Sequence, residues 1–215
     1  MNEIASALAG KFIVFDGPDG SGKSTQMRRF MQWSRGHGVT VKEVREPGGT
    51  PIGEQIRQVL LDPANECMTI QCEMLLYMSS RAQLVEQEIV PALARGELVV
   101  ADRFVSATLA YQGSAGGLPS DWIQKVAEVA VSGHWPDLTL ILDVDDATAA
   151  GRLNPLLDRM ELKGKSFHTK VREGFLEQAI AMPDRYCVID STMCEDSVEN
   201  AVQGAIRTWF CKENP

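Results

Sequence analysis

Short apolar runs alternate along the chain with longer stretches in which apolar residues are spaced three or four positions apart. Short runs bounded by turn residues are typical of buried strands, and the wider spacing is typical of amphipathic helices. Five strands are therefore predicted, at Phe12–Phe15, Val39–Val44, Leu98–Ala101, Leu138–Leu142 and Tyr186–Ile189. Helices are predicted in the remaining stretches, at about residues 23–35, 52–61, 70–94, 103–112, 120–132, 146–153, 167–181 and 195–211.

This alternation predicts an α/β fold in three layers, in which a five-stranded parallel sheet is flanked by helices on both faces. Crossovers between the strands are expected to be right-handed, and ligands are expected at the carboxyl ends of the strands. The segment 153–166 joins two predicted helices and contains Pro155, Gly164 and several charged residues, so we interpret it as a short lid. The chain is interpreted as a single domain over residues 1–215, with residues 1–10 as a tail or helical extension.

The loop after the first predicted strand carries a phosphate-binding pattern. Its sequence, Gly17-Pro-Asp-Gly-Ser-Gly-Lys-Ser24, matches G-x-x-x-x-G-K-[ST], the P-loop. The loop lies between a predicted strand and a predicted helix, as the pattern requires, so a plain glycine-rich turn is the weaker interpretation. Backbone N–H groups and the helix N-terminus would point at a polyphosphate, with Lys23 at the β- and γ-phosphates and the Ser24 hydroxyl on Mg²⁺. The predicted nucleotide-binding residues are Gly17, Pro18, Asp19, Gly20, Ser21, Gly22, Lys23, Ser24 and Thr25.

Polar residues also follow the second and third predicted strands. Arg45 precedes the turn Glu46-Pro-Gly-Gly-Thr50 and could hold a phosphate, although a solvated Arg–Glu pair in a plain loop fits the segment equally well. Asp102 and Arg103 follow the third strand directly. A carboxylate there can position Mg²⁺ through water, and the arginine beside it can neutralise an acceptor phosphate. A structural ion pair that caps the next helix is less favoured, because charges at these sheet ends usually face the ligand crevice.

The amino-acid composition limits the kinds of partner that the chain is expected to bind. The chain has 215 residues, of which 44% are hydrophobic and 23% charged, as in ordinary globular proteins. The net charge of −8 argues against a nucleic-acid polymer, although a few local cations suffice for a nucleotide. No run approaches about 18 apolar residues, so no membrane span is expected. The five cysteines form no C-x-x-C pair and the three histidines are isolated, which favours a reducing cytoplasm over a disulfide framework or a zinc site.

Six segments form an ordered series along the chain: Gly17–Thr25, Arg45–Thr50, Tyr77–Arg81, Asp102–Phe104, Ala110–Gly113 and Asp158–Glu161. In order and spacing this series resembles the motifs of the bacterial thymidylate kinases, from about Lys11 to Trp209. The resemblance implies a P-loop NTPase-type fold and transfer of the γ-phosphate of ATP to dTMP, giving dTDP and ADP with Mg²⁺. It also implies a homodimer.

The resemblance further implies roles for single residues around the acceptor phosphate and sugar. Arg45 and Arg103 would hold the acceptor phosphate, and Asp102 would organise the metal and its water shell. Asp19 would contact the sugar 3′-hydroxyl. Tyr111 would pack near C2′ and disfavour a ribose hydroxyl.

Two other segments would bind the base. Arg81 would hydrogen-bond the thymine edge, and Thr108 and Gln112 would add base contacts. Tyr77 stands where the family usually has a base-stacking Phe, and stacking survives that change. Because Tyr77 and Arg81 lie four residues apart on one helix face, plain packing or a cation–π contact is the alternative for this pair.

Two further positions depart from the family pattern. Ala107 stands where relatives commonly have Ser, so one polar contact is missing or is replaced by Ser106. The P-loop has Gly20 and no Arg, so the lid would supply the cation that stabilises the transition state, yet residues 153–157 contain no basic residue. The candidate catalytic residues are Lys23, Asp102, Arg103, Arg152 and Arg159, with Lys163 and Lys165 in reserve.

Three other functions stay open at this point. Another nucleoside monophosphate kinase or a deoxynucleoside kinase would use the same chemistry, but the segments 45–50 and 110–113 argue against it. A switch or assembly ATPase would hydrolyse ATP without an acceptor. A degenerate nucleotide-binding module would have lost activity, which the intact Lys23, Asp102 and Arg103 disfavour.

Overall fold

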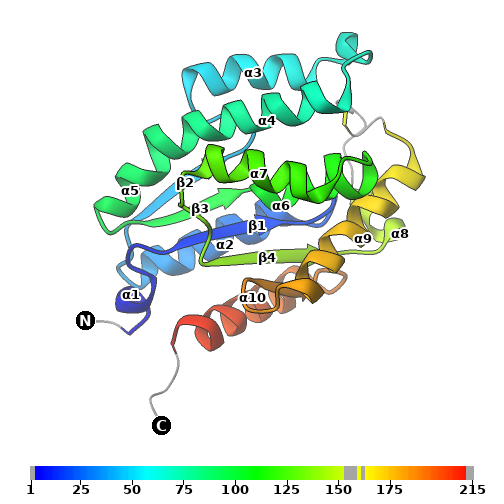
Figure 1. Cartoon of the computed structure of the whole chain (residues 1–215). Helices are drawn as coiled ribbons and strands as arrows, with labels where there is room; N and C mark the ends of the chain where they lie inside the picture. Colours follow the sequence, from blue (N-terminus) through cyan, green and yellow to red (C-terminus); the bar gives the residue numbers. More distant parts are fainter. Residues whose placement is uncertain (1–2, 153–158, 161–162, 212–215) are drawn as a thin grey trace.

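The computed structural model describes residues 3–152, 159–160 and 163–211, and its parallel sheet has helices on both faces (Figure 1). The strands are β1 (Phe12–Asp16), β2 (Val41–Arg45), β3 (Leu98–Asp102), β4 (Leu138–Asp143) and β5 (Tyr186–Asp190). Their order in the sheet is β2-β3-β1-β4-β5. The predicted three-layer α/β fold is confirmed, and the P-loop leaves the central strand of the sheet.

Each predicted helix has a counterpart in the described part of the chain, but two of them contain segments that are not α-helical. The predicted helix at 70–94 contains a π-helical segment, and the helix predicted from residue 103 begins two residues later and ends in a second π-helical segment. The helices are α1 (Glu3–Leu8), α2 (Lys23–Gly36), α3 (Pro51–Leu61), η1 (Pro63–Asn65, a 3-10 turn), α4 (Ile70–Leu84), η2 (Val85–Ile89, π-helical), α5 (Val90–Ala94), α6 (Val105–Thr108), η3 (Leu109–Ala115, π-helical), α7 (Ser120–Val131), α8 (Asp146–Arg152), α9 (Lys165–Ala181) and α10 (Glu195–Phe210).

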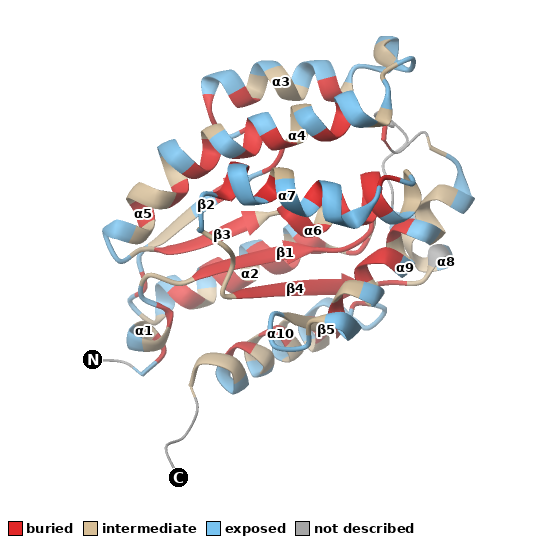
Figure 2. Cartoon of the chain, viewed as in Figure 1, coloured by how far each residue is buried: buried red, intermediate tan, exposed pale blue. Residues whose placement is uncertain are grey.

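Burial on both faces explains why β1 is a continuous apolar run and does not alternate with polar residues. Phe12 and Val14 face the core cluster that includes α4 and α7, and Ile13 and Phe15 face the cluster that includes α2 and α10. Figure 2 shows the inner strands buried between these helical layers. The sheet is therefore a rigid platform for the loops at its carboxyl edge.

Strand register brings the polar strand ends to one edge. Asp102 at the end of β3 is level with Phe15 of β1 and with Arg45 of β2. The P-loop, the turn after β2 and the segment after β3 consequently begin side by side, although they are separated by tens of residues in the sequence.

Two boundaries differ from the sequence-based prediction for local reasons. Val39 belongs to the turn that closes α2, because its N–H donates to the carbonyl oxygen of Ser34, so β2 starts at Val41. The wider π-helical turn of η2 ends two residues before Pro91, whose ring would clash with the carbonyl group four residues back in a regular helix.

The N-terminal extension is helical. Ile4 and Leu8 of α1 are buried in the cluster that includes α10. Most of the predicted lid, residues 153–158 and 161–162, lies outside the described residues, and its last two positions form the first turn of α9. No helix in the described part of the chain is long and apolar enough to span a membrane.

Gly17 should tolerate no side chain. Its φ is +133°, and an added Cβ would lie 2.4 Å from the Leu142 carbonyl oxygen. Gly17→Ala should therefore lower the free energy of unfolding by about 2–4 kcal/mol, as measured by urea denaturation. Gly204→Ala is the matched control, because that exposed position within α10 has nothing within 4 Å of the added Cβ. The control should gain about 0.5–1 kcal/mol. Equal stability of the two variants would contradict this account of the loop.

Candidate active site

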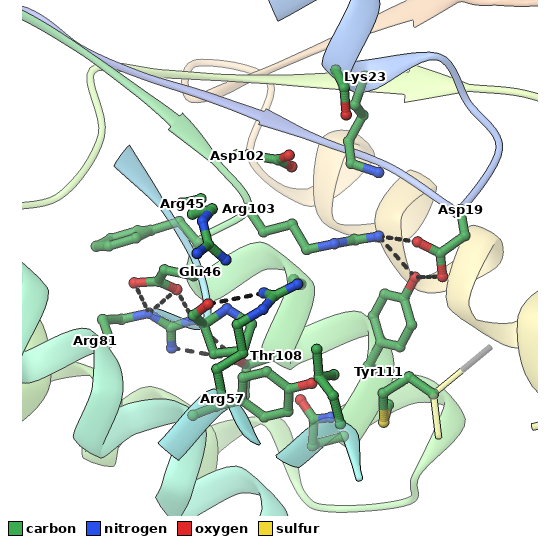
Figure 3. A pocket seen from close by; sticks show the side chains of 18 residues that line it. Asp19, Lys23, Arg45, Glu46, Arg57, Arg81, Asp102, Arg103, Thr108 and Tyr111 are labelled. Carbon is green, nitrogen blue, oxygen red and sulfur yellow. Dashed lines mark hydrogen bonds and ion pairs between the residues drawn. The ribbon is translucent and has the colours of Figure 1, made fainter. Parts of the chain in front are cut away.

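A cleft of about 270 Å³ opens at the carboxyl ends of β1, β2 and β3 (Figure 3). Its walls come from the P-loop, the turn after β2, helices α3 and α4, and the segment from the end of β3 into η3, together with Met160. The structure brings most of the site residues predicted from the sequence to this one cleft. They are Asp19, Lys23, Ser24, Arg45, Tyr77, Arg81, Asp102, Arg103, Thr108, Tyr111 and Gln112.

The P-loop takes its shape from glycines at positive φ, which is 133° at Gly17, 76° at Gly20 and 83° at Gly22. Helix α2 begins at Lys23, so its N-terminus follows the loop directly. The Nζ atom of Lys23 lies 3.4 Å from the carbonyl oxygen of Gly17. Burial lowers the pKa of Lys23, and the nearby guanidinium of Arg103 lowers it further. A bound polyphosphate would supply the negative charge that this buried ammonium group requires.

Arg103 is held in a strained backbone conformation with a φ of 68°. Its guanidinium donates to Asp16 at 3.2 Å and to the Gly17 carbonyl oxygen at 3.1 Å. It also pairs with Asp19 and donates to the Tyr111 hydroxyl at 3.2 Å. The Tyr111 hydroxyl in turn donates to Asp19 at 2.8 Å, which closes a triangle of three side chains (Figure 3). Arg103 is therefore fixed at the junction of the P-loop and the opposite wall.

The two carboxylates beside Arg103 differ in their electrostatics. Burial raises the pKa of Asp16, and this effect exceeds the opposing influence of Arg103. Burial acts on Asp19 in the same direction, but the cations Arg103 and Lys23 outweigh it and lower the pKa of Asp19. Asp19 therefore stays ionised at neutral pH and can accept a hydrogen bond from a sugar hydroxyl.

Arg81 on α4 forms a second buried pair, with Glu46 from the turn after β2. Arg81 is 1% exposed, and its Nε lies 3.1 Å and 2.8 Å from the two carboxylate oxygens of Glu46. Its Nη1 and Nη2 donate to Thr108 Oγ1 at 3.3 Å and 3.2 Å. The guanidinium also lies 5.1 Å from the centre of the Phe104 ring. The alternative of an aromatic pair with Tyr77 is therefore not the main contact of Arg81, and Glu46 is a site residue that sequence reasoning missed.

Two more arginines reach the cleft from neighbouring elements. Arg45 pairs with Glu54 of α3 at 2.8 Å and not with the residue that follows it, and both side chains are partly exposed. Arg57 of α3 also lines the cleft, and it donates to the Pro47 carbonyl oxygen at 2.9 Å. Sequence reasoning missed Arg57. The available signal was its position one helical turn after the buried Gly53, on the core-facing side of α3.

Gln112 is held by a carboxylate that sequence reasoning also missed. Its Nε2 donates to Glu73 at 2.8 Å, and Glu73 is 1% exposed. Glu73 also pairs with Arg159 at 2.6 Å and with Lys163 at 3.3 Å. Glu73 lies one helical turn before Tyr77 on α4, so its place on the cleft-facing side could have been noticed.

The two candidate catalytic arginines from the lid region have different surroundings. Arg152 ends α8, and its Nη1 donates to the Ser191 carbonyl oxygen at 3.0 Å and lies 4.0 Å from the position of a Cβ at Gly22. It is therefore beside the P-loop. Arg159 is 6% exposed and is committed to Glu73, so in this conformation it lies away from the loop. Of the reserves, Lys163 pairs with the same carboxylate, and Lys165 opens α9.

Ala107 and Tyr77, two of the departures from the family pattern, both line the cleft. Ser106 does not supply the polar contact that Ala107 lacks. Its hydroxyl is buried and donates to Asp16 at 2.6 Å, which ties it to the end of β1.

The fold and the site define a class of protein. A P-loop on the central strand of a parallel sheet, facing a wall of arginines across one cleft, is the arrangement of a P-loop phosphotransferase that acts on a second phosphorylated ligand.

Comparisons with known proteins specify the family. The family model described as "Thymidylate kinase" matches residues 15–202. The thymidylate kinase of Symbiobacterium thermophilum is 44% identical over 193 residues, covering 89% of this chain and 90% of the relative. That of Deinococcus radiodurans is 44% identical over 201 residues, covering 92% and 96%. The crystal structure of thymidylate kinase from Ehrlichia chaffeensis matches with a TM-score of 0.73 at 30% identity, covering 93% and 99%. The chain belongs to the thymidylate kinase family, as the motif series predicted.

The Glu46–Arg81 pair should make stability depend on pH. Burial raises the pKa of Glu46 from 4.5 to about 7, against the opposing effect of Arg81. The unfolded chain releases this proton at lower pH than the folded protein, so raising the pH through this window favours unfolding. Relative to Glu46→Gln, which has no proton to release, the wild type should lose on the order of 2–3 kcal/mol across the window. Urea denaturation of both proteins at several pH values measures this, and a difference that stays constant with pH would refute it.

Proposed function

We propose that this protein transfers the γ-phosphoryl group of ATP to dTMP, giving dTDP and ADP. The observation that carries the proposal is the shared cleft, which is lined by Lys23 of the P-loop together with Arg45, Arg81 and Arg103. Membership of the thymidylate kinase family supports dTMP as the acceptor.

ATP is expected on the P-loop, with its phosphates over the N-terminus of α2 and beside Lys23. The acceptor is expected across the cleft, with its phosphate between Arg45 and Arg103 and its 3′-hydroxyl near Asp19. This arrangement puts the two phosphates that react at the junction of the P-loop and the segment after β3.

Phosphoryl transfer between the two nucleotides would need no covalent intermediate with the protein. An oxygen of the acceptor phosphate would attack the γ-phosphorus in line, and the bond to the β-phosphate oxygen would break as ADP leaves. A phosphate dianion is already the nucleophile, so no strong general base is needed. The contribution of the protein is then positioning and neutralisation of charge. Lys23 supplies a buried cation, and Arg103 supplies one that its hydrogen bonds fix in place.

Mg²⁺ is expected at Ser24 and Asp102. The Ser24 hydroxyl and the Asp102 carboxylate line the same cleft, and oxygen donors of this kind, completed by water and phosphate oxygens, suit this hard cation. When bound, the ion neutralises charge that develops on the phosphate oxygens. The chain would hold it through these two residues, with Asp102 acting through the water shell.

Recognition of the base would rest on α4 and on the segment that runs into η3. Thr108 Oγ1 accepts from both terminal nitrogens of Arg81 and keeps its own proton, so it can donate to a base carbonyl. Tyr77 lines the cleft one helical turn before Arg81 and would stack on the thymine ring. Tyr111, held by Asp19, would lie against C2′ of the sugar.

Arg152 is the better-placed of the two lid-region arginines to neutralise the transferred phosphoryl group, because it lies beside Gly22 of the P-loop.

We interpret residues 1–215 as one kinase domain, with residues 1–10 as its extension and about 153–166 as its lid. Free cysteines at all five positions support a reducing, cytoplasmic location.

We also propose a homodimer that buries the outer sides of α3, α4 and α7. Helix α3 packs on α4, and α4 packs on α7, so their outward sides form a continuous surface (Figures 1 and 2). Large apolar side chains are exposed on it: Ile52, Val59, Leu75, Trp122 and Val129. A surface of this kind is stabilised by burial against a second copy.

Acceptor specificity tests the function. With ATP and Mg²⁺, dTMP should stimulate ADP release far more than dUMP, dGMP, dCMP, AMP or thymidine, and dTDP should be the product. Lys23→Ala should lower kcat about 10³-fold. Arg28→Ala, which removes an exposed cation from the same helix, is the matched control and should leave kcat unchanged.

Each other outcome points elsewhere. Preference for a different acceptor would keep the phosphoryl transfer and refute the base-site roles. ADP release without acceptor would indicate an ATPase, and no ADP release would indicate a nucleotide-binding module.

The dimer has a matched pair of variants. Val129 on α7 and Ile180 on α9 are each 81% exposed. Val129→Asp should convert the protein to a monomer in sedimentation equilibrium at micromolar concentration, because it places a charge in the proposed interface. Ile180→Asp should leave the dimer intact. A monomeric wild type, or dissociation by both variants alike, would refute this interface.

A further inference from the structure

The buried carboxylate of Glu73 binds three side chains that come from two separate segments of the chain. Gln112 from η3 donates to it at 2.8 Å, Arg159 pairs with it at 2.6 Å, and Lys163 lies 3.3 Å away. Glu73 itself lies on α4, on the same side as Tyr77 one turn later. One carboxylate therefore connects the helix of the predicted base site to Arg159 and Lys163 of the lid region.

Arg159 is held at both ends of its guanidinium. Its Nη1 pairs with Glu73, and its Nε donates to the carbonyl oxygen of Leu60, the penultimate residue of α3, at 2.6 Å. Its backbone N–H donates to the Leu61 carbonyl oxygen. The side chain is thus clamped between the end of α3 and the first turn of α4. Its remaining terminal nitrogen, Nη2, has no hydrogen-bond partner among the described residues.

This clamp determines a wall of the cleft. Met160 follows Arg159 directly, is 5% exposed, lines the cleft and packs in the core cluster that contains Tyr111 and Phe175. Gln112 lines the same wall, and its amide is oriented by its hydrogen bond to Glu73. Both residues would contact the acceptor nucleotide and not ATP, because the P-loop lies on the other side of the cleft.

The same contacts argue against a role for Arg159 in phosphoryl transfer. To reach the P-loop, its guanidinium would have to leave Glu73, and a buried carboxylate that loses its main cation is strongly disfavoured. Arg152 already lies beside Gly22 of the loop and is exposed, so no such exchange is required of it.

We propose that Glu73 and Arg159 form a buried anchor that fixes Met160 and Gln112 as one wall of the acceptor cleft. Arg159 is a positioning residue for the acceptor nucleotide, and Arg152 is the lid-region cation that serves the transferred phosphoryl group. This inference rests on the proposed function, because it takes dTMP as the ligand of that wall.

Binding measured without turnover separates the two roles. Titration calorimetry with dTMP alone, and with a non-hydrolysable ATP analogue alone, is applied to the full chain and to Arg159→Met. The variant should bind dTMP about tenfold more weakly and bind the ATP analogue as the wild type does, and kcat at saturating substrates should fall less than about tenfold. Arg152→Met should show the reverse split, with an unchanged dTMP Kd and a kcat lowered by about 10²-fold or more.

The anchor is tested through its two partners. Glu73→Gln should also weaken dTMP binding, and the double variant Glu73→Gln/Arg159→Met should bind dTMP about threefold tighter than Arg159→Met alone, because it removes the unpaired buried charge. If Arg159→Met does not fold, Arg159→Lys keeps a cation near Glu73 but loses the contact with Leu60, and its dTMP Kd should still rise. Arg35→Met, which removes an exposed arginine from the last turn of α2, is the control and should change neither Kd.

Opposite results overturn the inference. An unchanged dTMP Kd in Arg159→Met together with a kcat lowered by about 10³-fold would identify Arg159 as the cation of the transition state. Strictly additive losses in the double variant would show that the two residues do not act as a pair. A wild type that fails to bind dTMP would refute the proposed function itself, whatever the variants do.

Discussion

The buried carboxylate of Asp16, at the end of the central strand, is the interaction on which the rest of the site depends. It accepts hydrogen bonds from the Gly17 N–H at 3.0 Å, from Arg103 at 3.2 Å and from the Ser106 hydroxyl at 2.6 Å. These contacts join the start of the P-loop to the segment after β3. Arg103 adopts a left-handed backbone conformation that costs about 1–3 kcal/mol, and such a residue persists where its surroundings hold it from several sides. The position of the cation proposed for the acceptor phosphate therefore follows from a carboxylate that is fully buried and does not line the cleft.

A buried carboxylate that pairs with an arginine occurs three times around the cleft. Asp16 pairs with Arg103, Glu46 with Arg81, and Glu73 with Arg159, and all three carboxylates are buried. A buried ion pair is weak evidence for stability, but removal of one partner costs about 3–5 kcal/mol because it leaves a charge in the interior. Each pair thus restricts its arginine to one direction. Because every pair joins different segments, the three together define the walls of the cleft.

The distribution of charge over the whole molecule also favours the binding of phosphates in the cleft. The chain has a net charge of −8, yet Lys23, Arg45, Arg57, Arg81 and Arg103 all line one cleft. Concentrated cations attract phosphates to this place, while the acidic remainder of the surface disfavours binding of long polyanions. Two nucleotides carry several negative charges between them, so a cleft of this composition is adapted to hold them with their phosphates close together.

Local sequence determined much of this protein by itself. All five strands were predicted from short apolar runs, which are most continuous in β1, β3 and β4 because these inner strands are buried. The P-loop was recognisable because its glycines and the following helix form one contiguous unit. The motif series identified Arg81 and Arg103 as site residues.

Only the tertiary structure decided which side chains hold these arginines in place. Glu46 and Arg81 are 35 positions apart, and Asp16 and Arg103 are 87 apart, so each pairing depends on strand order and helix packing. In the sequence, Glu73 and Arg57 look like ordinary helix residues. Their roles became visible only in the structure, where α3 and α4 pack side by side. Arg159 was predicted to be a catalytic residue because the motif that contains it says nothing about which side chain it pairs with. That pairing depends on the residues that surround it in the folded protein.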